Sequence, residues 1–207
     1  NLQNPNVADY KYIVCMPVFE DRESAIQLML EIREVAPNGV FFICVDDGSV
    51  CEPIRVDGLR QTGVDGEVVT LNRNVGHQAA ISLGLRYCVR NHSGIPVVVM
   101  DSDGEDDPAA ISSMISLIGT AKIDVAMAQG QRRSEPITFK VGYFAYRHFF
   151  KLLTGRPIRF GNYAALSPFA AARLAEMDEG WPHFAATIIH SRLRIDYVPL
   201  DRRKRFF

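Results

Sequence analysis

Short apolar runs alternate with segments of helical period between residues 12 and 128, and this alternation limits the folds that the chain can adopt. The runs lack a polar residue at every second position, which is typical of strands buried on both faces of a sheet. Strands that alternate with helices at this spacing predict an α/β fold with a mostly parallel sheet between helical layers. The expected strands are 12–16, 40–45, 67–71, 95–100 and 124–128, and the expected helices are 24–35, 52–61, 78–89 and 108–118.

The pattern changes after residue 129. Residues 137–153 have a helical period and are rich in aromatic and basic side chains, which fits either a core helix or a helix at a membrane interface. Shorter elements follow and end in a strand-like segment at 194–198. Because no repeat, low-complexity tract or linker separates the two parts, we expect residues 1–207 to form a single domain.

The composition excludes several classes of protein. Of the 207 residues, 47% are hydrophobic and 23% are charged, and the formal net charge of −1 argues against a protein that binds a nucleic-acid backbone. No run approaches the roughly 18 apolar residues of a membrane-spanning helix. The four cysteines form no CxxC pair and no zinc-ligand spacing, so we expect reduced thiols. The chain starts without Met and stops within a basic run, so we expect a fragment of a longer protein.

Two aspartates directly follow the fourth expected strand, in the sequence Asp101-Ser102-Asp103. Ligands bind at the carboxyl ends of strands in open α/β sheets, so these carboxylates are expected to face a ligand crevice. Mg²⁺ typically takes one or two carboxylates together with phosphate oxygens, and Glu105 could supply a third oxygen. The alternative is a turn that caps the next helix, and this is the interpretation we favour for Asp106 and Asp107.

Further candidate residues follow the first two expected strands. Asp46 and Asp47 could form only an Asx turn, or could accept hydrogen bonds from a base or a ribose. Because the acidic turn follows a neighbouring strand, we favour the interpretation in which Asp46 and Asp47 accept hydrogen bonds from a base or a ribose. The loop at Pro17, Phe19 and Asp21 could bring backbone groups and an aromatic ring to a nucleobase, or could be a generic turn into a helix.

Two positions further along carry weaker signals. Arg132 follows the fifth expected strand, where an arginine is suited to bidentate pairing with phosphate. His77 follows Gly76 at the start of a helix, and we interpret it as a helix-start polar residue rather than a catalytic one.

In chain order these motifs resemble glycosyltransferase family 2 over residues 12–205: a Pro-x-aromatic loop, Val-Asp-Asp-Gly-Ser, Asn-x-Gly-x-x-x-Ala, an Asp-x-Asp turn and Gly-x-Arg. The chain is most similar to the polyprenyl-phosphate sugar synthases, the dolichol-phosphate mannose synthase and bactoprenol glucosyltransferase group. The resemblance implies a single GT-A domain, an α/β/α sandwich. Residues 10–129 would then form the nucleotide-binding half and residues 130–207 the acceptor side.

The resemblance also implies roles for individual residues. Asp101, Asp103 and Arg132 would be catalytic, and a divalent cation, Mg²⁺ or Mn²⁺, would be held by Asp101, Asp103 and Glu105. A UDP- or GDP-sugar would be bound by Pro17, Phe19, Asp21, Asp46, Asp47, Ser102, Arg132 and Arg205. The sequence departs from the family pattern at two places, which changes the oxygens expected to contact the metal and the base. Glu105 stands where these enzymes often have an amide residue, and Glu20-Asp21 stands where they usually have Asn-Glu.

Enzymes of this family invert the anomeric centre, so the expected reaction is direct displacement of the nucleoside diphosphate. A sugar hydroxyl needs a general base, commonly from a Glu-Asp pair that the second half lacks. A polyprenyl phosphate is already anionic and needs none, so we expect a polyprenyl phosphate acceptor. The alternatives are a saccharide hydroxyl acceptor and a non-catalytic nucleotide-binding relative. A nucleotidyltransferase would show a Gly-rich loop around Pro17, and none is present.

Proteins with this resemblance often continue into membrane segments. We therefore expect the chain to lie at the cytoplasmic face of a membrane, attached through residues that follow Phe207 in a longer protein. The basic run 202–205 fits either an approach to anionic headgroups or a solvated tail. The sequence gives no indication of the oligomeric state.

Overall fold

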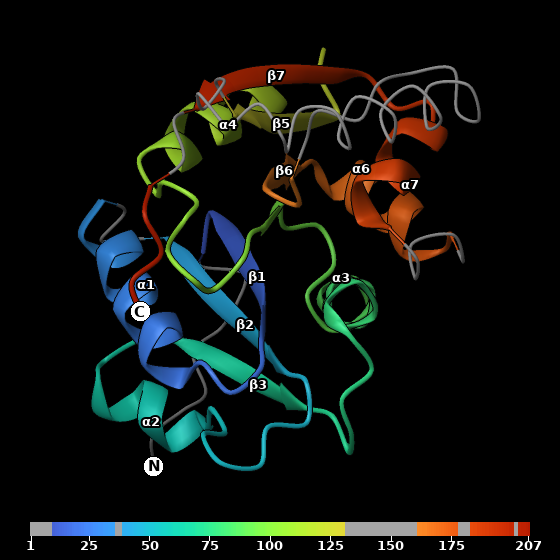
Figure 1. Ribbon diagram of the computed structural model, residues 1–207. Helices are drawn as coiled ribbons and strands as arrows, with labels where there is room; N and C mark the ends of the chain where they lie inside the picture. Colours follow the sequence, from blue (N-terminus) through green and yellow to red (C-terminus); the bar gives the residue numbers. More distant parts are fainter. Residues whose placement is uncertain (1–9, 36–38, 131–160, 178–182, 201–202) are drawn as a thin grey trace, which may run out of the picture.

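The computed structural model describes residues 10–35, 39–130, 161–177, 183–200 and 203–207. They form a seven-stranded sheet in the order β3-β2-β1-β4-β6-β5-β7 (Figure 1). Its strands are β1 (Tyr12–Val18), β2 (Val40–Asp46), β3 (Gly66–Thr70), β4 (Val97–Val99), β5 (Val125–Gly130), β6 (Ala164–Leu166) and β7 (Ile195–Leu200). The helices are α1 (Arg22–Val35), α2 (Val56–Gln61), α3 (His77–Asn91), α4 (Ala110–Gly119), α6 (Pro168–Ala175) and α7 (Phe184–His190).

The sheet is parallel except at β6, which pairs antiparallel with both β4 and β5. β1 pairs with β2 from Tyr12↔Val40 to Val18↔Asp46 and with β4 on its other side. Every residue of β1 and β2 is buried, as expected for strands covered on both faces. The predicted α/β fold with a mostly parallel sheet is therefore confirmed.

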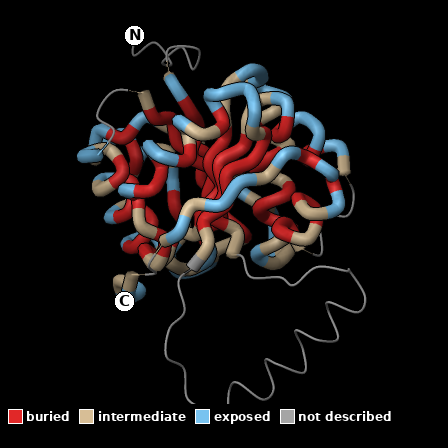
Figure 2. The backbone as a smooth tube through the Cα atoms, turned by 90° about the horizontal axis from the view of Figure 1, so that it is seen from above, coloured by how far each residue is buried: buried red, intermediate tan, exposed pale blue. Residues whose placement is uncertain are grey.

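A separate core lies on each face of the sheet. Val14 and Met16 of β1 face one core with α1 and α4, whereas Ile13 and Cys15 face the other with α3, α6 and α7. Figure 2 shows that much of the buried backbone lies at the centre of the molecule. The alternation along one strand between two cores follows from the two-residue period of a β-strand. The result is an α/β/α sandwich.

Helix α3 packs closely on the sheet because it carries a glycine at the contact. A Cβ atom at Gly84 would lie 2.6 Å from Cys15 Sγ and 2.7 Å from Val45 Cγ2, so no side chain fits there. Small Ala79 and Ala80 are buried on the same helix. The N-terminus of α3 is thereby held close to the carboxyl ends of β1 and β2.

Several details differ from the expected elements. β4 contains only Val97–Val99, and Pro96 directly before it has no N–H to donate to a neighbouring strand. Helix α2 begins at Val56 rather than near residue 52. Strand β6 was not expected at all. The segment 137–153 lies outside the described residues, and the division into a nucleotide-binding half and an acceptor half remains a prediction. Within the described part of the chain, no helix combines the length and apolar character that a membrane crossing requires.

Candidate active site

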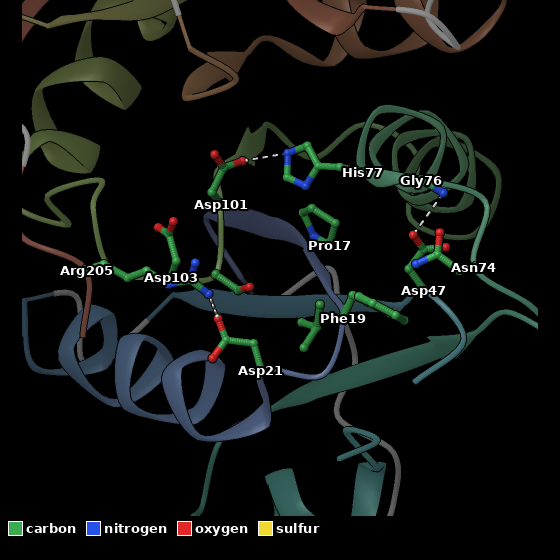
Figure 3. A pocket seen from close by; sticks show the side chains of 12 residues that line it. Pro17, Phe19, Asp21, Asp47, Asn74, Gly76, His77, Asp101, Asp103 and Arg205 are labelled. Carbon is green, nitrogen blue, oxygen red and sulfur yellow. Dashed lines mark hydrogen bonds and ion pairs between the residues drawn. The ribbon is translucent and has the colours of Figure 1, made fainter. Parts of the chain in front are cut away.

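A cavity of about 370 Å³ opens where β1, β2 and β4 end, a volume within the range of ligand pockets. Four carboxylates line it, each placed by a loop that follows one of these strands (Figure 3). The expectation that acidic residues from separate strand ends meet at one cavity is met in the structure. The full lining is Pro17, Val18, Phe19, Asp21, Asp47, Asn74, Gly76, His77, Asp101, Ser102, Asp103 and Arg205.

Asp101 lies beside His77, which begins α3. The distance between His77 Nε2 and Asp101 Oδ1 is 3.0 Å. The hydrogen bond to Asp101 raises the pKa of His77, and burial opposes this shift only in part. The negative charges of Asp101, Asp103 and Asp47 raise this pKa further. His77 therefore lies in a strongly negative electrostatic environment, and such an environment attracts a cation.

Asp46 and Asp47 have different positions although they are adjacent. Asp46 is fully buried and does not line the cavity, and its carboxylate accepts the backbone N–H groups of Ser49 at 2.8 Å and Ile54 at 2.9 Å. The structure thus places Asp46 outside the lining of the cavity, and its contact with the nucleotide stays a prediction. The physical reason is that successive side chains at a strand end point to opposite faces.

Asp47 lines the cavity and also fixes its far wall. Its Oδ1 accepts the N–H of Val75 at 2.7 Å, and its Oδ2 accepts the N–H of Gly76 at 3.0 Å. The side chain is 2% exposed. These two hydrogen bonds hold the loop that carries Asn74 against the end of β2, and Figure 3 shows Asn74 beside Asp47.

The loop after β1 is held by Glu20, which has a left-handed backbone with φ of 49°. Its carboxylate accepts N–H groups from three consecutive residues: Val50, Cys51 and Glu52. These backbone hydrogen bonds lower the pKa of Glu20. They join the β1 and β2 loops, so that Phe19, which is 49% exposed, stays at the mouth of the cavity.

The acidic turn is covered by the end of the chain. Arg203 N–H donates to Glu105 O at 2.9 Å, and Phe206 N–H donates to Asp103 O at 3.1 Å. The ring of Phe206 lies against Gly104, where any Cβ atom would collide with it. The chain end, marked in Figure 1, thus lies beside α1 and the turn.

Two arginines of this end pair with carboxylates. Arg205 Nη2 is 3.0 Å from Asp21 Oδ2 at the cavity, and Arg203 Nη1 is 2.7 Å from Glu31 Oε2 on α1. Part of the basic run thus forms ion pairs within the protein, and its approach to anionic headgroups stays a prediction.

The expected metal ligands are only partly brought together. Asp101 and Asp103 line the cavity, whereas Glu105 does not. Among the residues that the structure describes, no group of three or more histidine, cysteine, aspartate or glutamate side chains is arranged to hold a metal ion. Two of the three expected carboxylates thus line the cavity, and their role as metal ligands stays a prediction. Arg132 lies outside the described residues.

Two polar residues at the site were not assigned to it from the sequence: His77 and Asn74. His77 and Asn74 follow β3, so the rule applied to the other strand ends would have found them. Asn162 Nδ2 lies 2.9 Å from His77 Nε2 and 3.3 Å from Asp101 Oδ1, across a sequence separation that no local motif spans.

The chain is similar to known proteins in both sequence and structure. The chain is 26% identical over 138 residues to the dodecaprenyl-phosphate galacturonate synthase of Rhizobium johnstonii, covering 64% of this chain and 39% of that protein. It is 26% identical over 125 residues to the undecaprenyl-phosphate 4-deoxy-4-formamido-L-arabinose transferase of Pseudomonas fluorescens, covering 58% of this chain and 36% of that protein. The chain therefore spans less than half the length of these two relatives.

A solved structure has the same fold. Glucosyl-3-phosphoglycerate synthase from Mycobacterium tuberculosis, in complex with Mn²⁺, uridine diphosphate and glucosyl-3-phosphoglycerate, superposes with a TM-score of 0.59 at 16% identity. The match covers 96% of this chain and 73% of that one. The sequence model of glycosyl transferase family 2 matches residues 13–179, which is most of the chain. The protein therefore belongs to glycosyl transferase family 2.

Proposed function

We propose that this chain carries the donor site of an inverting glycosyltransferase that moves a sugar from a nucleotide sugar to a polyprenyl phosphate, with the help of a divalent cation. The observation that carries the proposal is the meeting of Asp21, Asp47, Asp101 and Asp103 with the guanidinium of Arg205 at one cavity. Four carboxylates beside one arginine suit a cation, and the arginine suits a phosphate group.

The residues present fit a metal that is bound together with the donor. Asp101 and Asp103 offer two carboxylates, and Mg²⁺ commonly completes its coordination with substrate phosphates and water. When bound, the cation would offset the charge that develops on the departing nucleoside diphosphate. Arg132 remains a proposed second partner of that diphosphate.

The opposite wall of the cavity is proposed to bind the nucleoside. Phe19 offers an exposed ring for a nucleobase, and Pro17 adds an apolar surface beside it. Asp47 and Asn74 add polar groups on the same side, where a base or ribose can form hydrogen bonds. This set is compatible with a UDP- or a GDP-sugar.

The acceptor is proposed to be a polyprenyl phosphate because two relatives carry prenyl phosphates in their names. The sequence supports this choice, because its second half lacks the Glu-Asp pair that commonly supplies a general base. A phosphate acceptor needs no carboxylate as a general base, whereas a sugar hydroxyl does. Such an acceptor would bring the chain to the cytoplasmic face of a membrane.

Asp103→Asn tests the proposal. The asparagine oxygen still accepts the N–H of Glu105, which Asp103 Oδ1 now accepts at 3.0 Å, so the turn is kept while the charge is lost. We expect Mn²⁺-dependent binding of UDP or GDP to disappear in calorimetry, and sugar transfer with it. Asp57→Asn on α2, where the side chain is 81% exposed, makes the same chemical change far from the cavity and should leave binding unchanged.

The acceptor is tested separately by assaying sugar transfer to short polyprenyl phosphates and to oligosaccharides. Transfer to the lipid phosphate alone supports the proposal, and transfer to the oligosaccharides alone overturns the lipid acceptor. Normal turnover by the Asp103→Asn chain would remove the metal assignment. A wild-type chain that binds neither nucleotide, with or without Mn²⁺, would leave only the non-catalytic alternative.

A further inference from the structure

We propose that Gln78 is a positioning residue, which fixes the metal-binding carboxylate of Asp101 through the side-chain amide of Asn162. This inference rests on the proposed function and adds to it a determinant outside the lining of the cavity. Gln78 is the second residue of α3, and the residues that it joins lie far from it in the chain.

Three hydrogen bonds form a continuous path, called the amide relay below. The backbone N–H of Phe184, the first residue of α7, donates to Gln78 Oε1 at 2.7 Å. Gln78 Nε2 donates to Asn162 Oδ1 at 3.1 Å. Asn162 Nδ2 then donates to Asp101 Oδ1 at 3.3 Å. The relay therefore connects α7, α3 and the segment before β6 to the acidic turn.

The direction of the relay is fixed at one end. A backbone N–H can only donate, so the atom of Gln78 that faces Phe184 must be its carbonyl oxygen. The other end of the Gln78 amide must then be the donor, and it requires the oxygen of Asn162 to face it. Asn162 is left with its NH₂ group directed at Asp101. Both amide orientations thus follow from one backbone group, without free choice at either side chain.

His77 adds a second restraint on the same carboxylate oxygen. Its Nε2 lies 3.0 Å from Asp101 Oδ1, so a ring N–H and the Asn162 amide converge on one atom. Nε2 also lies 2.9 Å from Asn162 Nδ2, but this contact is a hydrogen bond only in the tautomer without a proton on Nε2, in which His77 does not donate to Asp101. Two nitrogen donors around one oxygen restrain rotation of the carboxylate, and a metal ligand gains affinity from such pre-orientation.

The Gln78→Glu substitution distinguishes the relay from a simpler role, in which Gln78 only anchors α7 by accepting the N–H of Phe184. One glutamate oxygen still accepts the N–H of Phe184, so the anchor is kept. The other oxygen faces Asn162 Oδ1, and two acceptors repel each other. The Asn162 amide must therefore turn, and its oxygen then faces the carboxylate of Asp101. The loss of a hydrogen bond behind a metal ligand typically lowers metal affinity by about 10- to 100-fold.

The experiment is calorimetry of UDP and of GDP in the presence of Mn²⁺, combined with thermal melting without nucleotide. We expect Gln78→Glu to weaken the Mn²⁺-dependent binding by about 10- to 100-fold while the melting temperature stays close to that of wild type. The added negative charge alone would act in the opposite direction and strengthen cation binding. Gln61→Glu, at the exposed end of α2, is the matched control and should change neither quantity.

Gln78→Ala completes the comparison, because it removes both the anchor and the relay. If Gln78 only anchors α7, then Gln78→Ala loses stability and binding while Gln78→Glu behaves as wild type, and the relay is overturned. Tighter binding by Gln78→Glu overturns it as well. If the wild-type chain binds neither UDP nor GDP in the presence of Mn²⁺, the proposed function itself is overturned. If the wild-type chain binds and Gln78→Glu binds equally well, only the relay is overturned.

Discussion

Replacing Asp47 with asparagine changes one carboxylate oxygen into an NH₂ group without changing the size of the side chain. In the structure, each oxygen accepts a backbone N–H, from Val75 at 2.7 Å and from Gly76 at 3.0 Å. An asparagine can accept only one of them, and its NH₂ group must face the other N–H. The substitution therefore leaves a donor opposite a donor at a site where Asp47 is 2% exposed.

The expected cost follows from these two contacts. A hydrogen bond to a charged group contributes about 1.5–3 kcal/mol, and one is lost completely while the other loses its charge. We therefore expect the free energy of unfolding to fall by about 3 kcal/mol. For a chain of this size, each kcal/mol corresponds to about 2–4 °C, so the melting temperature should fall by about 6–12 °C. Nucleotide binding should weaken as well, because the loop that carries Asn74 loses its restraint.

Thermal and urea unfolding followed by circular dichroism measure the stability, and calorimetry with Mn²⁺ and UDP or GDP measures the binding. Asp57→Asn is the control, because its partner Arg60 lies 4.0 Å away on the surface and such pairs contribute less than about 1 kcal/mol. A melting temperature within about 2 °C of wild type for Asp47→Asn would show that this carboxylate does not hold the loop.

Two further predictions concern the acidic turn and the histidine beside it. Gly104→Ala places a Cβ atom against Phe206 at a φ of 80°, so we expect the free energy of unfolding to fall by about 1–3 kcal/mol and residues 203–207 to be cleaved faster by a protease. Gly58→Ala is the control, because the space around Gly58 is open, and it should cost no stability. Equal effects of the two substitutions would argue against the contact between Gly104 and Phe206. Because folding raises the pKa of His77, its pair with Asp101 should stabilise the metal-free chain below pH of about 6.5 and lose this contribution as pH rises through the raised pKa. Urea unfolding of wild type and His77→Asn across pH measures it, and a stability difference that grows with pH would contradict the assignment.

The parts of the fold that were predictable are those encoded by local pattern. β1 and β2 are continuous apolar runs, and both are strands with every residue buried. β6 was missed because Ala164–Leu166 is too short to show any period, and its antiparallel pairing depends on where the chain re-enters the sheet.

The parts of the site that were predictable depend on a rule about strand ends. That rule placed Asp47, Asp101 and Asp103 at one edge, and they line one cavity. It could not distinguish Asp46 from Asp47, because that requires knowing which face of β2 points toward the ligand. The contact of Asn162 with Asp101 spans 61 residues and arises only from tertiary packing.

The site also shows why so many acidic groups can coexist in a folded chain without a bound cation. Asp47 is compensated by two backbone N–H groups, Asp21 by Arg205, and Asp101 by His77 and an amide. The compensating groups come from residues 75–77, from Arg205 and from Asn162, so the charge repulsion that would open the cavity is opposed by contacts that also define its shape. A cation that binds only the folded chain would add stability by mass action, with a gain of about 2.7 kcal/mol at one hundred times its dissociation constant. The proposed metal therefore has a consequence that needs no catalysis: Mn²⁺ with a nucleoside diphosphate should raise the melting temperature of wild type, and should not raise that of Asp103→Asn.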